Sequence, residues 1–265
     1  MDIKEVIERI VDTYINHVEK ELLNSNKSKR IKELKNYLLR YLSKLDILYI
    51  TVIGSILYGI NTSNSDMDVL VVIRNGIGKE KINIKDYKID LLVYNLDTYI
   101  EDILQFRDIY LIPSLYTTKE LEFYMFKGFE NIRKTLRKNL INKTTFKILI
   151  NKAKELYNIF NTEHKLKYGV NAIRILAEVE DLVAAREIYY PSGIRDLLIN
   201  LRTNTYRDDI PRFYKKYLSK AEAIVKHSKI RKKEVDLNKY IYYKYLKGGL
   251  GEHKSYRHDC TANVG

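Results

Sequence analysis

Apolar side chains recur every three or four positions over residues 3–22 and 31–45, with charged side chains between them. This spacing places the apolar positions on one side of a helix. Three short apolar runs follow at 47–53, 69–73 and 88–94, rich in β-branched residues and bounded by turn residues. Runs of this kind are typical of buried strands. The pattern therefore predicts two amphipathic helices that cover one face of a small sheet.

Beyond the third apolar run the pattern predicts mainly helices. One helix is expected to begin near Asp97 and another to span 115–126, after an interruption at Pro113 and Ser114. In the second half of the chain the periodicity predicts helices at 148–160, 168–186, 194–202 and 212–227. Ser192 is the expected N-cap of the third of these.

These elements predict an α+β fold, in which a small mixed sheet flanked by helices precedes a helical C-terminal domain. The composition changes near residue 130, where an excess of basic residues begins. The expected domains are 1–130, with its N-terminal helices at 1–45, and a basic helical domain at 131–247. Residues 248–265 lack periodicity and are expected to form a flexible tail.

The positive charge of the chain is concentrated in its second half. The formal net charge is +13, yet residues 1–130 carry 18 Lys and Arg against 20 Asp and Glu. Residues 131–265 carry 29 against 14. Such asymmetry suggests a region that meets a polyanion such as RNA, DNA or a triphosphate. The alternative explanation is a coding bias, since Lys, Asn, Ile and Tyr are abundant together.

Composition also excludes several classes of protein. The chain has one cysteine, Cys260, so neither a disulfide framework nor a cysteine-based zinc site is expected. No apolar run approaches the roughly 20 residues that a membrane-spanning helix needs. The first helix lacks the apolar core of a signal peptide. We therefore expect a cytoplasmic protein with no membrane contact.

Three carboxylates stand out by their position relative to the predicted strands. Asp66 and Asp68 are two residues apart at the start of the second run, so their side chains emerge on the same side. Asp90 interrupts the third run, where an unpaired acid is costly to bury. If the third strand pairs with the second, all three carboxylates meet. A hard-oxygen site of this kind suits Mg²⁺ or Mn²⁺.

A glycine and a serine immediately follow the first predicted strand. Gly54 lets the backbone approach a triphosphate closely, and Ser55 adds a hydroxyl donor. The alternative for Asp66 and Asp68 alone is a capped turn, because Asn, Ser and Asp are ordinary turn residues. With Gly54 and Ser55 upstream and Asp90 downstream, a catalytic site is favoured.

Gly54-Ser55, Gly59, Thr62, Ser65-Asp66-Met67-Asp68 and Asp90 together resemble the signature of the DNA polymerase β-like nucleotidyltransferase superfamily. The form Gly-Ser-x-x-Tyr-Gly followed by Ser-Asp-x-Asp is closest to a bacterial and phage group of nucleotidyltransferases found with RNA-repair genes. The run 167–176 also resembles the helical region of that group, although similar members often carry a histidine where Asn171 stands.

The resemblance implies a role for each residue of the motif. Asp66 and Asp68 would bind two metal ions, Mg²⁺ or Mn²⁺, and Asp90 would hold the catalytic ion and help to deprotonate the acceptor hydroxyl. The residues implied in binding the NTP are Gly54, Ser55, Ser65, Lys167 and Arg174. For Lys167 and Arg174 a solvated helix face is an equal alternative.

The leading hypothesis for function is an enzyme that moves a nucleoside monophosphate from an NTP to an RNA end, as in tRNA repair, and releases pyrophosphate. The basic second half would bind the RNA. A second hypothesis is the same chemistry on a protein partner, as in AMPylation by an antitoxin, or on a small molecule. A third is a nucleic-acid-binding module without catalysis.

Overall fold

The computed structural model describes residues 2–17, 27–62, 65–76, 78–190, 193–203 and 205–230. Two helices, α1 (Ile3–His17) and α2 (Lys27–Leu42), precede the sheet. They confirm the predicted amphipathic pair, because the apolar stripe of each helix is buried against the sheet. The predicted break between them, at Asn24-Ser25-Asn26, lies outside the described residues.

The sheet has five strands in the order β3-β4-β2-β1-β5. It is mixed, because β2 and β4 run parallel while the other neighbouring pairs are antiparallel. A parallel pair needs a crossover connection, and here the crossover contains the edge strand β3. The strands are β1 (Ile47–Ile53), β2 (Met67–Ile73), β3 (Lys79–Ile84), β4 (Ile89–Asn95) and β5 (Glu122–Met125).

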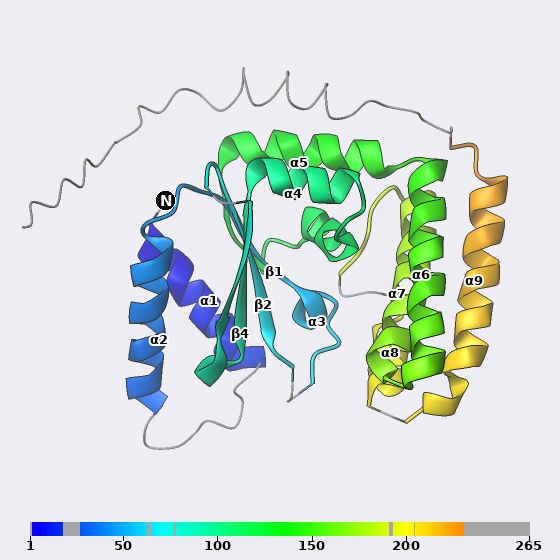
Figure 1. Ribbon diagram of the computed structural model, residues 1–265, viewed down its shortest axis with the longest axis horizontal. Coiled ribbons are helices and arrows are strands. Elements are labelled where there is room, and N and C mark those ends of the chain that lie inside the picture. Colours follow the sequence, from blue (N-terminus) through cyan, green and yellow to red (C-terminus); the bar gives the residue numbers. More distant parts are fainter. Residues whose placement is uncertain are drawn as a thin grey trace, which may run out of the picture. The chain divides into compact units, whose positions relative to one another are not determined.

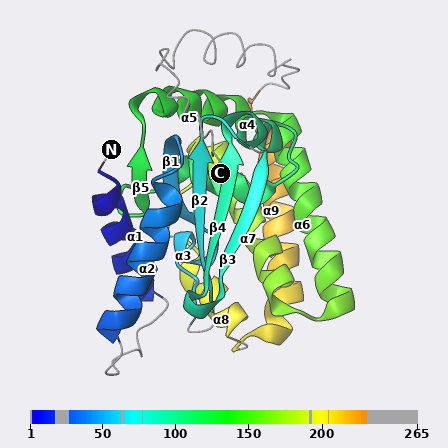
Figure 2. The same cartoon turned by 60° about the vertical axis from the view of Figure 1, so that its left-hand side comes forward.

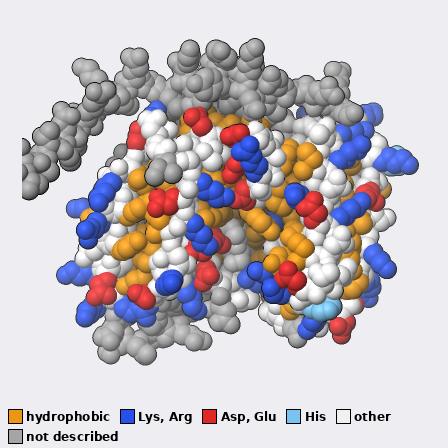
Figure 3. All heavy atoms as spheres, viewed as in Figure 1, with side chains coloured by type: hydrophobic (Ala, Val, Ile, Leu, Met, Phe, Trp, Pro, Cys, Tyr) orange, Lys and Arg blue, Asp and Glu red, His pale blue; other side chains and the backbone are white. Residues whose placement is uncertain are grey.

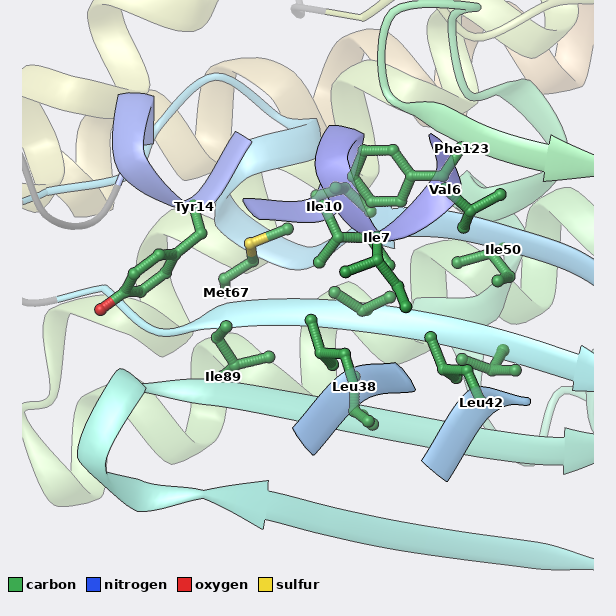
Figure 4. Packing of buried hydrophobic residues seen from close by; sticks show 14 of the residues in the cluster. Val6, Ile7, Ile10, Tyr14, Leu38, Leu42, Ile50, Met67, Ile89 and Phe123 are labelled. Atoms are coloured by element: carbon green, nitrogen blue, oxygen red, sulfur yellow. The ribbon is translucent and has the colours of Figure 1, made fainter. Parts of the chain in front are cut away.

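Alternate residues of the central strands face α1 and α2 on one side of the sheet (Figures 1 and 2). Met67 and Ile89 project from β2 and β4 into this layer, where Ile10 and Leu38 of the two helices meet them (Figure 4). Strand side chains alternate between faces. Asp68 and Asp90, one residue further along each strand, therefore point to the opposite face.

The opposite face is partly covered by helices that follow β4. These are α4 (Leu96–Leu104), the 3₁₀ helix η2 (Ile109–Tyr116) and α5 (Lys127–Leu140). Tyr49 of β1 stacks on Phe129 of α5 and donates a hydrogen bond to the carbonyl oxygen of Ser114 over 2.8 Å. Residues of η2 and of the helices that come next line a cavity together with Asp68.

The C-terminal region is a helical layer, shown at the right of Figure 1. It comprises α6 (Lys143–Glu163), α7 (Leu166–Ala184), α8 (Arg195–Arg202) and α9 (Ile210–His227). Gly169 lets these helices pack closely, because a Cβ there would lie 2.8 Å from Cγ2 of Ile210 and 3.2 Å from the ring of Phe160. The α+β fold predicted from the pattern is thus confirmed, including its helical C-terminal part.

Two elements differ from the sequence-based expectation. The charged stretch before β4 forms strand β3, whose Ile82 and Ile84 alternate with polar residues along an edge of the sheet. The helix expected at 115–126 is wrong: this stretch ends η2 and then forms β5, which pairs with β1. The free edge of β1 accounts for the second difference, since pairing satisfies its backbone groups.

Several expectations fall on residues that the structure does not describe. They concern Ser192 as an N-cap, Cys260, and the tail at 248–265. The domain boundary near residue 130 stays a prediction. Within the described ranges, no helix combines the length and apolar character needed to cross a membrane.

Candidate active site

Gly54 and Asp68 lie side by side where β1 ends and β2 begins. The antiparallel register of β1 and β2 pairs Ile53 with Asp68, so the next residue of the chain passes beside the carboxylate. Gly54 has φ of +69°, and a Cβ at this position would overlap Oδ2 of Asp68. Only glycine meets both requirements, because other residues rarely adopt this backbone conformation. The chain then turns directly into the short helix α3 (Gly54–Leu57), which carries Ser55.

Two of the three predicted carboxylates come from one strand pair. Asp68 and Asp90 are register partners in the parallel pair β2 and β4, as the predicted pairing of these strands requires. Asp66 lies one residue before β2 and is exposed, whereas Asp90 is buried. The carboxylates therefore differ in their access to solvent, and Asp66 and Asp68 form the more open side of the group.

The electrostatics of Asp68 reflect this crowding. Burial and the neighbouring charge of Asp90 raise the pKa of the Asp68 carboxyl to about 6, and Lys81 and Arg202 offset the shift only in part. Asp66 adds a smaller repulsive contribution in the same direction. Two carboxylates that repel each other in this way are stabilised by a cation between them.

Side chains of β3, the strand at the edge of the sheet, contact the third carboxylate, Asp90. Asn83 is the register partner of Asp90, and its Nδ2 donates to Oδ1 of Asp90 over 2.5 Å. Lys81, two residues earlier on the same side of β3, places Nζ 2.7 Å from Oδ2. Both oxygens of Asp90 are therefore occupied by side chains of β3.

The loop between α3 and β2 is fixed by arginines of α8. Arg195 donates from Nε to the carbonyl oxygen of Gly59 over 2.8 Å. Arg202 donates to the carbonyl oxygen of Ile60 and to Oγ of Ser65, each over 3.1 Å. The hydroxyl of Ser65 also accepts from the backbone amide of Thr62 over 2.8 Å. The C-terminal helices thus set the conformation of the loop that leads to Asp66.

A cavity of about 470 Å³ opens in front of these residues. Volumes of this order are typical of ligand pockets. Its lining combines polar and charged residues with apolar residues and two tyrosines, Tyr58 and Tyr110, which suits a charged triphosphate and a planar base. The polar residues include Gly54, Ser55, Ser65, Asp66, Asp68 and Arg202, and the apolar residues include Leu92, Leu111 and Val170.

The two basic residues expected to bind the NTP occupy different environments. Lys167 is exposed and lines the cavity, so the structure brings it together with Ser55 and Asp68. Arg174 is 1% exposed and pairs with Glu178, and its guanidinium lies 4.0 Å from the ring centre of Tyr58. Arg174 is not among the residues that line the cavity. It is therefore neither on a solvated face nor at the cavity wall.

The donor set fits one hard divalent cation at the open side of the group. Mg²⁺ is usually held by one or two carboxylates together with substrate phosphate oxygens and water. Asp66 and Asp68 supply two carboxylates beside the cavity, and Gly54 leaves the space that a Cβ would fill. Among the described residues, no three His, Cys, Asp or Glu side chains are grouped closely enough to hold a metal ion by themselves.

Sequence reasoning missed several residues of the site because their elements were not predicted. Lys81 and Asn83 lie on β3, where the alternation of Ile82 and Ile84 was an available signal. Tyr110 belongs to η2 and reaches the cavity from a stretch without clear periodicity. The contacts of Arg202 with the loop depend on tertiary packing, and no local pattern indicates them.

Comparison with known proteins bears on the first half of the chain. No curated protein matches the sequence. A solved structure of a nucleotidyltransferase-like protein from Exiguobacterium sibiricum 255-15 is similar over 74% of each chain, with 10% identity and a TM-score of 0.31. The model of the nucleotidyltransferase domain family matches residues 31–127, which include the glycine–serine turn and all three carboxylates. This match supports a nucleotidyltransferase domain in that part of the chain, the general activity of which is transfer of a nucleoside monophosphate.

Proposed function

We propose that the protein transfers a nucleoside monophosphate from an NTP to a hydroxyl at the end of an RNA. The observation that carries the proposal is the close approach of Gly54 to Asp68, both of which line a cavity of about 470 Å³, with Asp90 as the register partner of Asp68. The nucleotidyltransferase family match over 31–127 supports the reaction class.

The reaction forms one bond and breaks one. The oxygen of the acceptor hydroxyl attacks the α-phosphorus of the NTP, and the bond from that phosphorus to the oxygen that bridges to the β-phosphorus breaks. Pyrophosphate leaves with that bridging oxygen, and the hydroxyl proton passes to a carboxylate of the site or to water. The protein therefore has to hold the triphosphate and the acceptor in line and to balance negative charge.

Polar and basic residues of the cavity lining provide hydrogen-bond donors and positive charge for the triphosphate. At Gly54 the backbone is accessible without a side chain, and Ser55 offers a hydroxyl. Lys167 and Arg202 add positive charge at the same cavity. Arg202 also fixes Ser65 through its hydrogen bond, so it links triphosphate binding to the loop that carries Asp66.

In this proposal Asp66 and Asp68 hold a divalent cation, Mg²⁺ or Mn²⁺. When bound, the cation neutralises charge on the triphosphate as the leaving group departs. The carboxylate of Asp68 is oriented by its strand and by the turn at Gly54. Arg174 takes a positioning role beneath Tyr58, whose ring it contacts, rather than contacting the nucleotide.

A basic groove between α6 and α9 supports RNA as the acceptor. It encloses about 410 Å³, and its lining contributes four lysines and one acid. The acid, Glu222, pairs with Lys154 over 2.7 Å. The remaining lysines of the groove are Lys143, Lys147 and Lys226. Figure 3 shows that basic side chains spread over this helical side of the molecule. Surfaces of this kind bind the phosphates of nucleic acids.

The test is transfer of label from α-³²P NTPs, each supplied separately with Mg²⁺ and a mixture of tRNA and other small RNAs. Labelled RNA that is lost with Asp68→Asn supports the proposal. The fragment released by nuclease digestion then identifies the modified end. Unlabelled RNA with no pyrophosphate release under any NTP contradicts the proposal.

The same experiment separates the other hypotheses. Label on a co-purified protein or on a small molecule would support the same nucleotidyl transfer with that molecule, rather than RNA, as the acceptor. A non-catalytic RNA-binding module predicts that the double variant Asp66→Asn with Asp68→Asn keeps its full biological function. The enzyme predicts that this variant loses activity and still binds RNA.

A further inference from the structure

Lys81 lies within the field of all three carboxylates of the site. Its Nζ pairs with Asp90 over 2.7 Å. The hydrogen bond to Asp90 raises the pKa of Lys81, and the charges of Asp68 and Asp66 raise it further. A positive charge on β3 is therefore already present beside the carboxylate group.

Both oxygens of Asp90 accept from side chains of β3. Asn83 donates to Oδ1 over 2.5 Å and Lys81 occupies Oδ2. Both partners project from the same side of β3, which pairs with β4 along its whole length. Asp90 is only 5% exposed, so solvent does not compete strongly for its oxygens. A metal ion at Asp90 would have to compete with the ammonium group of Lys81, whose side chain is 55% exposed.

We infer that Lys81 is a fixed cation of this active site: it takes Asp90 as its partner, so that the nucleotide complex holds one divalent ion, at Asp66 and Asp68, rather than two. The inference rests on the proposed function, because it concerns the same site. It assigns Asp90 a positioning role, in which the carboxylate anchors an ammonium group next to Asp68. Lys81 then supplies part of the positive charge near the reacting phosphates.

The experiment counts Mn²⁺ bound to the protein with a non-transferable NTP analogue, α,β-methylene-ATP, by the loss of the electron paramagnetic resonance signal of free Mn²⁺. One ion per complex is expected for the wild type. Asp90→Asn should still bind one ion, since Asp66 and Asp68 are intact and the amide keeps the hydrogen bond with Asn83. Asp68→Asn should weaken Mn²⁺ binding at least tenfold. Two ions in the wild type, falling to one in Asp90→Asn, would overturn the inference.

Lys81→Met provides the reverse test, because it frees Oδ2 of Asp90. A second Mn²⁺ ion is expected to bind to this variant. The control is Lys85→Met, which removes an exposed lysine directly after β3; it should still bind one ion. Lys81→Met that holds one ion would contradict the claim that Lys81 excludes the second.

Stability measurements cover the case in which Lys81→Met folds poorly. The double variant Lys81→Met with Asp90→Asn removes both charges, so it should melt at a higher temperature than Lys81→Met alone. Additive effects of the two changes would show that the pair does not form in solution and would overturn the inference. If neither Mn²⁺ nor the analogue binds to the wild type, the proposed function fails as well. Two ions with the analogue bound defeat the inference alone.

Discussion

At the scale of single residues, the site depends on one glycine and one carboxylate. Gly54 is required by its backbone conformation and by its contact with Asp68. Asp68 has a raised pKa because it is buried beside Asp90. The burial and repulsion at Asp68 impose a cost on folding, and a bound cation would relieve it. Carboxylates with perturbed pKa values are typical of functional sites.

Gly54→Ala is expected to damage the site more than the fold. The left-handed backbone costs an alanine about 1–2 kcal/mol, and the added methyl group would push Asp68 aside. We expect nucleotide binding to weaken at least tenfold, with a modest fall in melting temperature. Gly193→Ala is the matched control, because nothing lies within 4 Å of a Cβ at that position. Equal effects of the two substitutions would contradict the role of Gly54.

Asp68→Asn should stabilise the metal-free protein, and the gain should depend on pH. Folding raises the pKa of this carboxyl from 3.8 to about 6. Ionised Asp68 therefore lowers the free energy of unfolding, by an amount that grows as the pH rises from 3.8 to about 6 and is constant at higher pH. A shift of this size corresponds to about 3 kcal/mol. Urea denaturation with EDTA should show the gain at pH 8 and little gain at pH 3.5.

Addition of Mg²⁺ provides the second arm of this measurement. A cation at Asp66 and Asp68 should stabilise the wild type, since a ligand that binds only the folded state raises stability. Asp68→Asn should show no such response. Destabilisation by Asp68→Asn at pH 8 without metal would show that the carboxylate is not under repulsion.

At the scale of elements, the site is assembled from the ends of strands and from a helix distant in sequence. The register of β1, β2 and β4 brings Gly54, Asp68 and Asp90 to one end of the sheet. Helix α8 adds Arg195 and Arg202, which hold the carbonyl groups of the preceding loop. The helical C-terminal part therefore contributes directly to the geometry of the candidate site.

Arg202→Met should loosen this loop. The change removes two hydrogen bonds of a charged donor, each of which contributes about 1.5–3 kcal/mol in typical proteins. We expect KM for the NTP to rise tenfold or more, and amides at 59–62 to exchange with solvent faster in a hydrogen–deuterium exchange experiment. The control is Arg212→Met. It removes an exposed arginine of α9 that pairs with Asp209, just before that helix, and it should leave both quantities unchanged. Unchanged exchange in Arg202→Met would contradict the role of α8.

At the scale of the whole molecule, charge is divided between two regions. Residues 1–130 carry the three carboxylates of the candidate site and have a slight excess of negative charge. Residues 131–265 carry 29 Lys and Arg against 14 Asp and Glu. The basic groove between α6 and α9 belongs to the second region. The division fits a protein in which one part performs the chemistry and the other attracts a polyanionic acceptor.

Removal of the charge of this groove should weaken RNA binding without altering NTP binding. The affected residues, each changed to Gln, are Lys143, Lys147, Lys154 and Lys226. Affinity for RNA should fall, and the slope of log affinity against log salt should decrease by about 0.7 for each lost phosphate contact to a single strand. Fluorescence anisotropy at several salt concentrations measures both quantities.

The control for this variant has the same change in net charge at exposed lysines of the first region. Suitable positions, each changed to Gln, are Lys4, Lys32, Lys44 and Lys85. An equal loss of RNA affinity in the control would indicate a general charge effect rather than binding in the groove.

The sequence by itself determined the parts of this protein that follow from local periodicity and from short spacings. Apolar residues spaced every three or four positions predicted the amphipathic helices, and short β-branched apolar runs predicted the strands β1, β2 and β4. Together they predicted the α+β class. The spacing of Asp66 and Asp68, with Gly54 before and Asp90 after, predicted which residues meet. The predictions of these helices, strands and fold class succeed because burial of an apolar face and alternation along a strand are properties of the segment itself.

Only the tertiary structure decided which partners these residues meet. Strand β5 forms because the edge of β1 needs a partner, and its own sequence favoured a helix in our prediction. Lys81 binds Asp90 because β3 pairs with β4. Arg174 is buried under Tyr58, whereas Lys167 on the same helix reaches the cavity. Such contacts join residues far apart in the chain or depend on what covers a surface, so no local pattern encodes them.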